Sequence, residues 1–171
     1  MKKILLLTTG GTIASRPTEE GLSPEMDGAG LLSRLGGAAD NYALTIRDLL
    51  RLDSSNIQPE EWQLIARAVY EARDGFDGVV ITHGTDTMAY TASVLSFMLQ
   101  NISIPVVLTG AQLPIEHPLT DALENMRTAL AMASSGVGGV FLAFDRKVIL
   151  GTRAVKTRTT DFDAFESVNW P

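Results

Sequence analysis

The 171-residue sequence contains no cysteine, only two histidines and no long hydrophobic run. Without cysteine it can form neither a disulfide nor a thiolate metal site, and His83 and His117 lack the spacing of metal ligands. We therefore expect no metal and no cofactor. No window reaches the ~18 apolar residues of a membrane span. The apolar stretch at residues 4–7 is also shorter than the ~7–15 residues of a signal-peptide core. A soluble, cytoplasmic chain without a membrane partner is expected.

Positive charge is also scarce. Fourteen basic residues stand against 20 acidic ones, which gives a net charge of -6. Such a balance repels a polyphosphate backbone, so nucleic acid is not an expected partner. The length and the 45% hydrophobic content suit one sizeable core. We therefore expect residues 1–171 to form a single domain.

Short β-branched apolar runs, each bounded by Gly or Pro, alternate with amphipathic segments. The runs occupy residues 4–7, 79–81, 106–108 and 140–144, and helices are expected at 59–73, 88–99 and 121–134, the last capped by Thr120 or Asp121. Strands that alternate with helices predict a doubly wound α/β fold with a mostly parallel sheet and helices on both faces.

The expected sheet also predicts where a ligand binds. Sites in such folds lie beyond the carboxyl ends of the strands, which selects the loops 8–15, 82–87 and 109–114 and the loop after residue 144. Residues 147–159 are typical of a β-hairpin around Gly151. The acidic and aromatic segment that follows adds no further element, so a linker is expected to begin near residues 165–171.

The first loop contains the sequence TTGGT, with Gly10 and Gly11 followed by Thr12. A dinucleotide fingerprint needs G-x-G-x-x-G and a P-loop needs G-x-x-x-x-G-K-[ST], and both are absent. Two interpretations remain. The glycines form a tight turn with a positive φ, or they present Thr12 as a nucleophile while backbone N–H groups stabilise an oxyanion.

A second loop, HGTDT at residues 83–87, favours the nucleophile. It opens on the same edge of the expected sheet and adds Thr85 and Asp86, which resemble the base and orienting group of acyl transfer. The base itself stays open. A single loop histidine such as His83 is usually structural, and Lys156 can act as a base only with desolvation or cationic neighbours, for which Arg153 and Arg158 are candidates.

Four stretches, in this order, carry a family resemblance: LLLTTGGTIAS, VVITHGTDTMAYTA, PVVLTGAQLP and GTRAVKTRTTDFDAFESVN. Together they closely resemble the bacterial-type L-asparaginases, in particular the cytoplasmic type I branch, over residues 3–170. The resemblance implies hydrolysis of L-asparagine to L-aspartate and ammonia, often with weaker glutaminase activity, and implies no cofactor and no metal.

The resemblance also implies catalytic roles. Thr12 corresponds to the nucleophile on a mobile loop, and Thr85, Asp86 and Lys156 correspond to a second cluster that activates water or relays protons. The backbone amides of Gly11 and Thr85 are expected to stabilise the oxyanion.

For the substrate, the resemblance implies that Asp86 holds the ammonium group. Ser54 is expected to bind the α-carboxylate and Ser55 to lie near the ammonium end, although the same serines also suit the N-cap region of the helix that follows. The backbone of Ala111 is expected to contact the side-chain amide, although a small residue in a turn is the alternative.

The chain departs from the family in two ways. Many members carry a tyrosine in the loop after the nucleophile, where this chain has Leu22, and neither Tyr42 nor Tyr90 aligns with that position. Members are also about twice as long, with a smaller C-terminal domain that helps to build a dimer or tetramer and lends a residue to the neighbouring site. The resemblance therefore covers the N-terminal domain only, which alone is expected to be weakly active or inactive.

Two alternatives remain open. One is the amidase-like subunit of a transfer-RNA-dependent amidotransferase, which shares the TGGTIAS-type site but carries a further domain before it, for which the motif at Thr9 leaves no room. The other is a non-catalytic module that binds aspartate or asparagine.

Overall fold

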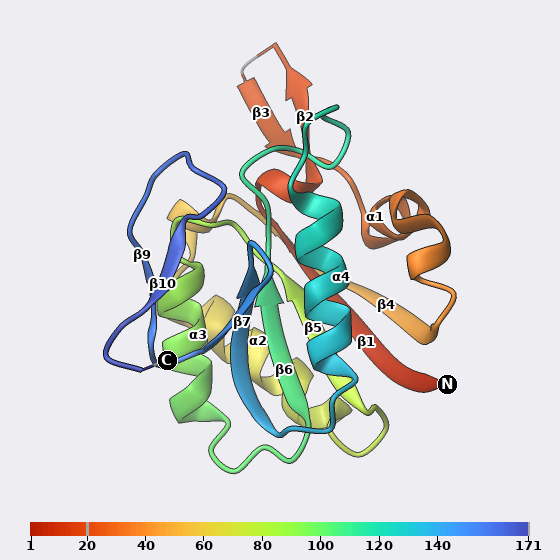
Figure 1. The fold of residues 1–171 in the computed structure, drawn as a ribbon, viewed down its shortest axis with the longest axis vertical. Helices are drawn as coiled ribbons and strands as arrows, with labels where there is room; N and C mark the ends of the chain where they lie inside the picture. The colour runs from red at the N-terminus through yellow and green to blue at the C-terminus, as the bar shows by residue number, and fades with distance from the viewer. Residues whose placement is uncertain (20, 171) are drawn as a thin grey trace.

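The computed structural model describes residues 1–19 and 21–170, and its centre is a six-stranded sheet (Figure 1). The strand order is β4-β1-β5-β6-β7-β8, in which the first five are parallel and β8 runs antiparallel to β7. The strands are β1 (Lys2–Gly10), β4 (Tyr42–Leu52), β5 (Gly78–Thr82), β6 (Pro105–Thr109), β7 (Gly139–Phe144) and β8 (Lys147–Leu150). The four apolar runs lie in β1, β5, β6 and β7, as predicted, whereas β4 was not expected.

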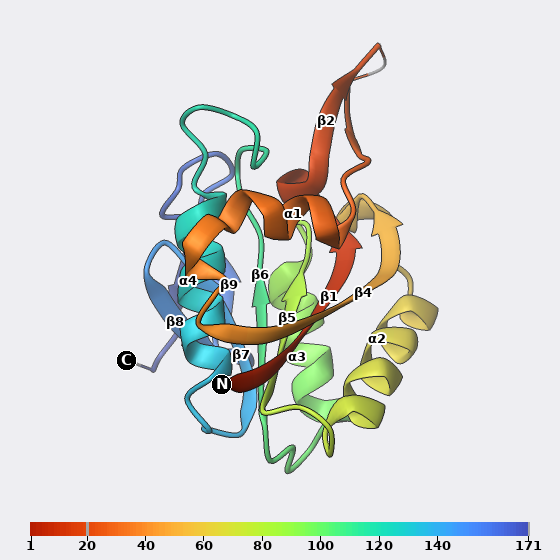
Figure 2. The ribbon, with the colours of Figure 1, turned by 90° about the vertical axis from the view of Figure 1, so that its right-hand side faces the viewer.

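Four α-helices cover the two faces of this sheet (Figure 2). One face is covered by α1 (Gly28–Leu35) and α4 (Ala122–Ala133), and the other by α2 (Pro59–Ala72) and α3 (Met88–Met98). The doubly wound α/β fold is thereby confirmed. The three predicted helices are present within one residue of their expected ends, and α1 is an addition. No helix in the described part of the chain is long and apolar enough to cross a membrane.

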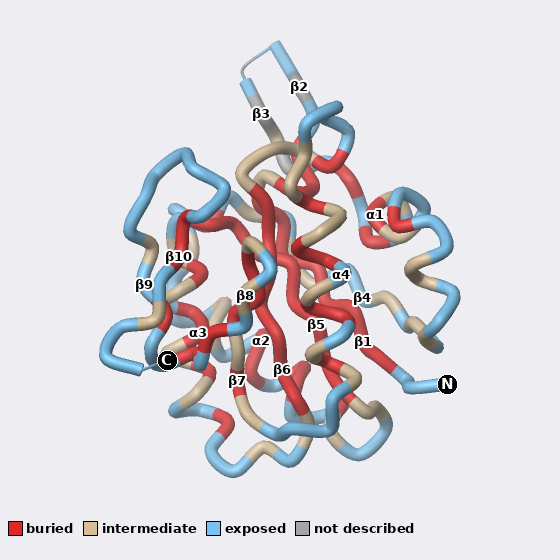
Figure 3. The backbone as a smooth tube through the Cα atoms, in the orientation of Figure 1, coloured by how far each residue is buried: buried red, intermediate tan, exposed pale blue. Residues whose placement is uncertain are grey.

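The central strands β1, β5, β6 and β7 are buried over most of their length (Figure 3). Their side chains alternate between two cores, so both faces of these strands are covered. In β1, Leu5 and Leu7 pack with α2 and α3, whereas Ile4 and Leu6 pack with α1 and α4. All four side chains are fully buried. A continuous apolar run is what such a strand requires, which explains why these strands were readable from sequence.

The two residues expected to cap α4 have different roles. The hydroxyl of Thr120 accepts a hydrogen bond from the N–H of Ala122, so Thr120 caps the helix. The carboxylate of Asp121 makes no such cap and accepts bonds from the N–H groups of Gln112 and Leu113 instead. Asp121 thus holds the loop that follows β6.

The C-terminal third departs from the expected hairpin. β8 pairs with β7 through a turn at Asp145 and Arg146, which have φ values of 49° and 60°. A separate hairpin is formed by β9 (Ala154–Lys156) and β10 (Phe165–Ser167). Hairpins are therefore present, but the one predicted around Gly151 is wrong. The expectation of no new element after residue 160 is also wrong, because Phe165 is fully buried in β10. A linker further on stays a prediction.

Another small hairpin, β2 (Ser15–Thr18) and β3 (Gly21–Pro24), projects from the end of the sheet directly after the first loop (Figure 1). Three short 3₁₀ turns complete the described elements: η1 (Thr12–Ala14), η2 (Gly36–Ala38) and η3 (Ser54–Asn56).

The connections of the parallel strands reverse direction at β1. The chain passes from β1 to β4 on one side and then returns to β5 on the other side of β1. A crevice forms at such a switch point, beyond the carboxyl ends of the two central strands. The fold therefore directs a ligand to the loops after β1 and β5.

Candidate active site

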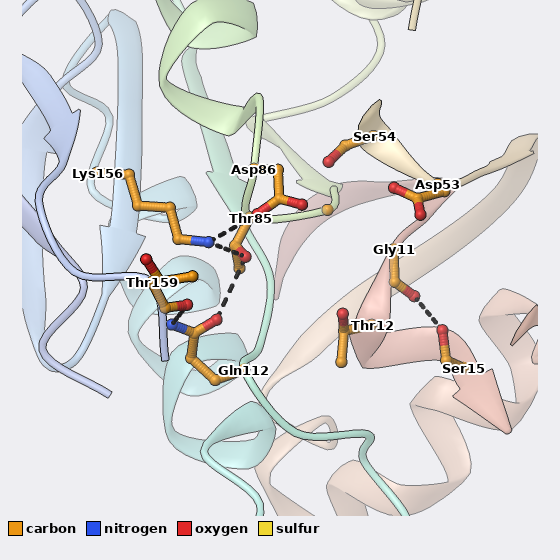
Figure 4. Close-up of a pocket in the computed structure, with 11 residues that line it drawn as sticks. Gly11, Thr12, Ser15, Asp53, Ser54, Thr85, Asp86, Gln112, Lys156 and Thr159 are labelled. Carbon is orange, nitrogen blue, oxygen red and sulfur yellow. Dashed lines mark hydrogen bonds and ion pairs between the residues drawn. The ribbon is translucent and has the colours of Figure 1, made fainter. Parts of the chain in front are cut away.

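A cavity of about 250 Å³ lies at this switch point (Figure 4). Its size is near the lower end of the ~300–1,000 Å³ that is typical of small-molecule pockets. The lining comes from the loops after β1, β4, β5 and β6 and from the end of β9: Gly11, Thr12, Ser15, Asp53, Ser54, Gly84, Thr85, Asp86, Gln112, Lys156 and Thr159. Three of the four loops selected from the sequence contribute. The loop after β7 does not, because it is the tight turn into β8.

The glycine pair brings the first two loops into contact. Gly11 has a φ of 81°, and a Cβ there would lie 2.5 Å from the N atom of Gly84. Both the conformation and the space therefore require glycine. The N–H of Gly11 donates to the carbonyl oxygen of Leu52 at 3.0 Å, which contradicts the expectation that this amide is free for an oxyanion. The amide of Thr85 remains the predicted oxyanion donor.

Thr12 begins the turn η1 and lines the cavity, half-buried. The turn is held by the hydroxyl of Ser15, which donates to the carbonyl oxygen of Gly11 at 3.0 Å. No hydrogen bond joins the hydroxyl of Thr12 to another residue drawn in Figure 4. The hydroxyl therefore faces the cavity without a base from this lining at its side.

A cluster on the other wall supplies the titratable groups. The Nζ atom of Lys156 lies 2.9 Å from the hydroxyl of Thr85 and 2.9 Å from Oδ1 of Asp86. The lysine side chain is only 15% exposed, whereas that of Asp86 is 62% exposed. The expected desolvation of Lys156 is therefore present, whereas a role of Arg153 and Arg158 as cationic neighbours stays a prediction. Arg158 pairs with Asp161 and Asp163 of its own loop and with Glu166 of β10.

Hydroxyl groups tie the strand ends together beneath the cavity. Thr9 donates to the carbonyl oxygen of Thr82 at 2.7 Å, which joins the ends of β1 and β5. Thr87 donates to the carbonyl oxygen of Ser54 at 2.9 Å, which joins the loops after β5 and β4. These bonds fix the two walls relative to each other.

The two serines expected to bind substrate differ in position. Ser54 is buried and lines the cavity beside Gly84. Ser55 is exposed and outside the lining, and its hydroxyl and N–H both bind Oδ1 of Asp53. Asp53, which belongs to the stretch that resembles the family's substrate loop but was given no role, lines the cavity in its place and caps η3. The serines do not cap α2, which begins with a capping box of Gln58 and Glu61.

The loop after β6 provides a residue that the sequence patterns did not single out. Ala111 is buried in the core beneath α4 and does not line the cavity, so its backbone contact with substrate stays a prediction. The next residue, Gln112, does line it. This loop had already been selected from the sequence because it follows the carboxyl end of a strand. A polar side chain within it, directly after Ala111, could therefore have indicated Gln112 as a residue of the site.

His83 is structural. It is 1% exposed and is absent from the cavity lining. Its Nδ1 pairs with the carbonyl oxygen of Gly84 at 2.8 Å, and its Nε2 with the hydroxyl of Thr91 at 2.9 Å. Burial lowers the pKa of the imidazole to about 4, so the ring is neutral near pH 7. This excludes His83 as a base that reaches a ligand in the cavity.

The backbone of Leu22 pairs with that of Pro17 in the β2–β3 hairpin. Its side chain lies outside the part of the chain that the structure describes. Tyr42, at the start of β4, and Tyr90, exposed on α3, do not line the cavity. No substitute for the tyrosine of the family is therefore assigned.

The geometry suits acyl transfer. A hydroxyl without a hydrogen bond to the other residues of the lining faces a lysine, threonine and aspartate cluster across a small polar cavity. Chemically, such an arrangement can supply a nucleophile and a separate proton-transfer group.

Comparison with known proteins identifies relatives of this chain. The family model "Asparaginase, N-terminal" matches residues 3–171. The L-asparaginase of Thermococcus kodakarensis is 51% identical over 99% of this chain, and its solved structure superimposes with a TM-score of 0.93. A probable cytoplasmic L-asparaginase from Campylobacter jejuni is 33% identical over 98% of this chain, with a TM-score of 0.85 and 52% of its own length covered.

A different class of relative is also present. A glutamyl-tRNA(Gln) amidotransferase subunit from Thermoplasma acidophilum is 36% identical over 99% of this chain and 44% of its own length. The chain spans about half the length of the curated relatives it matches, 52% for the Thermococcus L-asparaginase. Because the family model covers residues 3–171, nearly the whole sequence, the chain belongs to the asparaginase family, of which it represents the N-terminal domain.

Proposed function

We propose that this domain carries the catalytic residues of an L-asparaginase that hydrolyses L-asparagine to L-aspartate and ammonia. The observation that carries the proposal is the placement of the Thr12 hydroxyl opposite the Lys156, Thr85 and Asp86 cluster across one cavity. The 51% identity to an L-asparaginase supports this substrate over other amides.

In the proposed reaction, the hydroxyl oxygen of Thr12 attacks the side-chain amide carbon of asparagine. A C–O bond forms, the carbonyl oxygen becomes an oxyanion near the amide of Thr85, and the hydroxyl proton passes to the amide nitrogen. Collapse of this tetrahedral intermediate breaks the C–N bond and releases ammonia, leaving an ester on Thr12.

Water then completes the cycle. The hydroxyl of Thr85 and the amine of Lys156, in its neutral form, take a proton from water as the water oxygen attacks the ester carbon. The proton returns to the oxygen of Thr12 as the C–O bond breaks, which leaves the amine neutral again. The products are aspartate and a regenerated hydroxyl. Asp86 pairs with Lys156 at 2.9 Å, and we assign to it both the orientation of that amine and a share in binding the substrate ammonium.

Substrate orientation is assigned to the opposite end of the cavity. Ser54, buried beside Gly84, is proposed to bind the α-carboxylate. Ser55 touches Asp53 and lies outside the lining, so its contribution is proposed to pass through that carboxylate. The backbone of Ala111 is proposed to meet the substrate amide.

The test is ammonia release from L-asparagine, together with mass analysis of the peptide that contains Thr12. Thr12→Ala should abolish turnover and the ester adduct, whereas Thr152→Ala, in an exposed turn, should retain both. Measurable turnover that is equal in wild type and Thr12→Ala would refute the nucleophile.

The chain alone is proposed to be weakly active or inactive. In the complete protein, we propose that a C-terminal domain completes the site and that the chains form a homo-oligomer, either a dimer or a tetramer. We also propose a cytoplasmic location. Adding the C-terminal half of a related asparaginase should restore turnover that depends on Thr12. Another outcome is that turnover is absent both for the chain alone and with the added half, while calorimetry still detects aspartate binding. That result would favour a non-catalytic amino-acid-binding module over an enzyme.

The similarity to the Thermoplasma amidotransferase subunit favours a second candidate, release of ammonia for a transfer-RNA-linked reaction. The net charge of -6 speaks against RNA contact by this domain. Ammonia release from free asparagine without any transfer RNA would favour the asparaginase.

A further inference from the structure

The side chain of Gln112 spans the gap between Thr85 and the loop of residues 157–163 (Figure 4). Its Nε2 donates to the carbonyl oxygens of Thr159, at 3.1 Å, and Asp161, at 2.9 Å. A carbonyl oxygen only accepts hydrogen bonds, so these two contacts determine which end of the amide is nitrogen. The Oε1 atom therefore faces Thr85, whose hydroxyl lies 3.3 Å away.

This orientation determines where the hydrogen of the Thr85 hydroxyl points. Lys156 donates to the hydroxyl oxygen at 2.9 Å, and Gln112 offers only an acceptor. A hydroxyl has one hydrogen, which is therefore directed to Gln112 in this state. For Thr85 to pass a proton to Lys156, its hydroxyl must first turn away. At 3.3 Å the bond is longer than the ~2.5–3.0 Å typical of hydroxyl donors, which makes that turn easy.

Gln112 is held rigidly from below. The carboxylate of Asp121 accepts bonds from the N–H groups of Gln112 and Leu113 at 3.0 to 3.1 Å. The buried side chain of Asn125 donates both to Asp121 and to the carbonyl oxygen of Gly110. The backbone from which the Gln112 side chain reaches Thr85 is therefore fixed to the first turn of α4.

The loop is also held by the neighbouring strands, since Lys147 of β8 pairs with the carboxylate of Asp163 and Arg158 pairs with that of Glu166 in β10. The N–H of Thr157 donates to the carbonyl oxygen of Ala164 at 2.8 Å, and the guanidinium of Arg158 donates to that of Asp163 at 2.8 Å. The contacts with Gln112 attach the loop to the wall of the cavity from outside.

We propose that Gln112 is a positioning residue that couples the hydroxyl direction of Thr85 to the closed position of the loop 157–163. Its importance for catalysis rests on the proposed function, in which Thr85 and Lys156 move protons. The coupling itself does not depend on turnover.

A double-mutant cycle tests the coupling, with amide hydrogen exchange at Thr157 as the readout of loop opening. Gln112→Met removes every amide contact, and Thr85→Val removes the hydroxyl while it keeps the shape. We expect roughly tenfold faster exchange in Gln112→Met and about threefold in Thr85→Val, with the double variant within about twofold of Gln112→Met. Gln63→Met, exposed on α2, is the matched control and should exchange like wild type.

Two results would overturn the proposal. One is unchanged exchange in Gln112→Met. The other is that Thr85→Val speeds amide exchange by the same factor in the Gln112→Met background as in wild type. The threonine would then act on the loop through Lys156 and not through Gln112. If Gln112→Met does not fold, Gln112→Glu replaces it, since it keeps an acceptor but cannot donate to the two carbonyls, and it should open the loop by a similar factor.

Kinetics separate positioning from simple support of the fold. With L-asparagine, Gln112→Met should lower kcat by about tenfold and change KM by less than about twofold, since the substrate contacts remain. A change in KM alone would contradict a role at Thr85. If the chain shows no turnover alone, the kinetics are measured after the C-terminal half of a related asparaginase is added. Absence of turnover there too would contradict the proposed function, and the exchange cycle would still decide the coupling.

Discussion

Acidification should destabilise this domain through His83. The imidazole is 1% exposed, and its pKa falls from 6.5 to about 4 because burial penalises the charged form. The unfolded chain therefore binds the extra proton in the window between these two pKa values. The contribution of His83 to the free energy of unfolding is complete above about pH 6.5 and is lost as the pH falls toward 4.

The size of this loss follows from the two pKa values. A difference of about 2.5 units corresponds to about 3 kcal/mol in total, of which about 2 kcal/mol is lost by pH 5. The hydrogen bonds explain why the ring resists protonation. Trp62 donates its Nε1–H to the Thr91 hydroxyl, so the hydroxyl hydrogen is free to point at Nε2 of His83. A proton on that nitrogen would displace this arrangement.

Urea unfolding between about pH 4.5 and 7 measures the effect. Carboxylates also titrate in this range, so the comparison is with His83→Gln, which should lose the part of the pH dependence that belongs to the imidazole. His117→Gln, at an exposed histidine, should keep it. If wild type and His83→Gln show the same pH dependence, the neutral buried imidazole is refuted.

Three further substitutions test the packing around the site. In thermal unfolding, Gly11→Ala should lose about 1–3 kcal/mol more stability than Gly136→Ala. Both glycines have a φ near 80°, but only at Gly11 would a Cβ meet another backbone. Equal losses would show that the close approach is relaxed easily. Thr91→Val should lose about 2 kcal/mol in urea unfolding, because it leaves an indole N–H and an imidazole nitrogen unpaired. Asp121→Ala should lose about 2–3 kcal/mol and speed amide exchange in the loop after β6, since two N–H groups lose their acceptor. Unchanged exchange there would contradict the role of the carboxylate.

The parts of the fold that could be predicted from sequence are those buried on both sides. β1, β5, β6 and β7 have apolar side chains in both cores, so each produces a continuous apolar run. β4 lies at the edge of the sheet, and its exposure alternates along residues 42–47. A search for continuous runs misses such a strand, whereas the period of two in YALTIR would have indicated it.

The false hairpin has a different physical cause. Gly151 suggested a turn, but its small size serves a close contact, since a Cβ there would lie 2.9 Å from both the Ser96 hydroxyl and the carbonyl oxygen of Val140. The actual turn uses Asp145 and Arg146 at positive φ. The loop after residue 144 was expected, and Asp145 is a common turn residue, but arginine is rare at positive φ, so residue 146 did not suggest a two-residue turn.

The same distinction explains the glycine pair in the first loop. Sequence patterns suggested that glycine makes room for an oxyanion, yet Gly11 makes room for the backbone at Gly84, and Gly84 in turn makes room for Ser54, whose Oγ would lie 2.5 Å from a Cβ. Three loops thus approach each other through residues that lack side chains. Thr12 and Thr85 each follow one of these glycines directly, so the close backbone packing is what brings the two threonines to opposite walls of one cavity. A side chain at Gly11 or Gly84 would separate the walls while every proposed catalytic residue was still present.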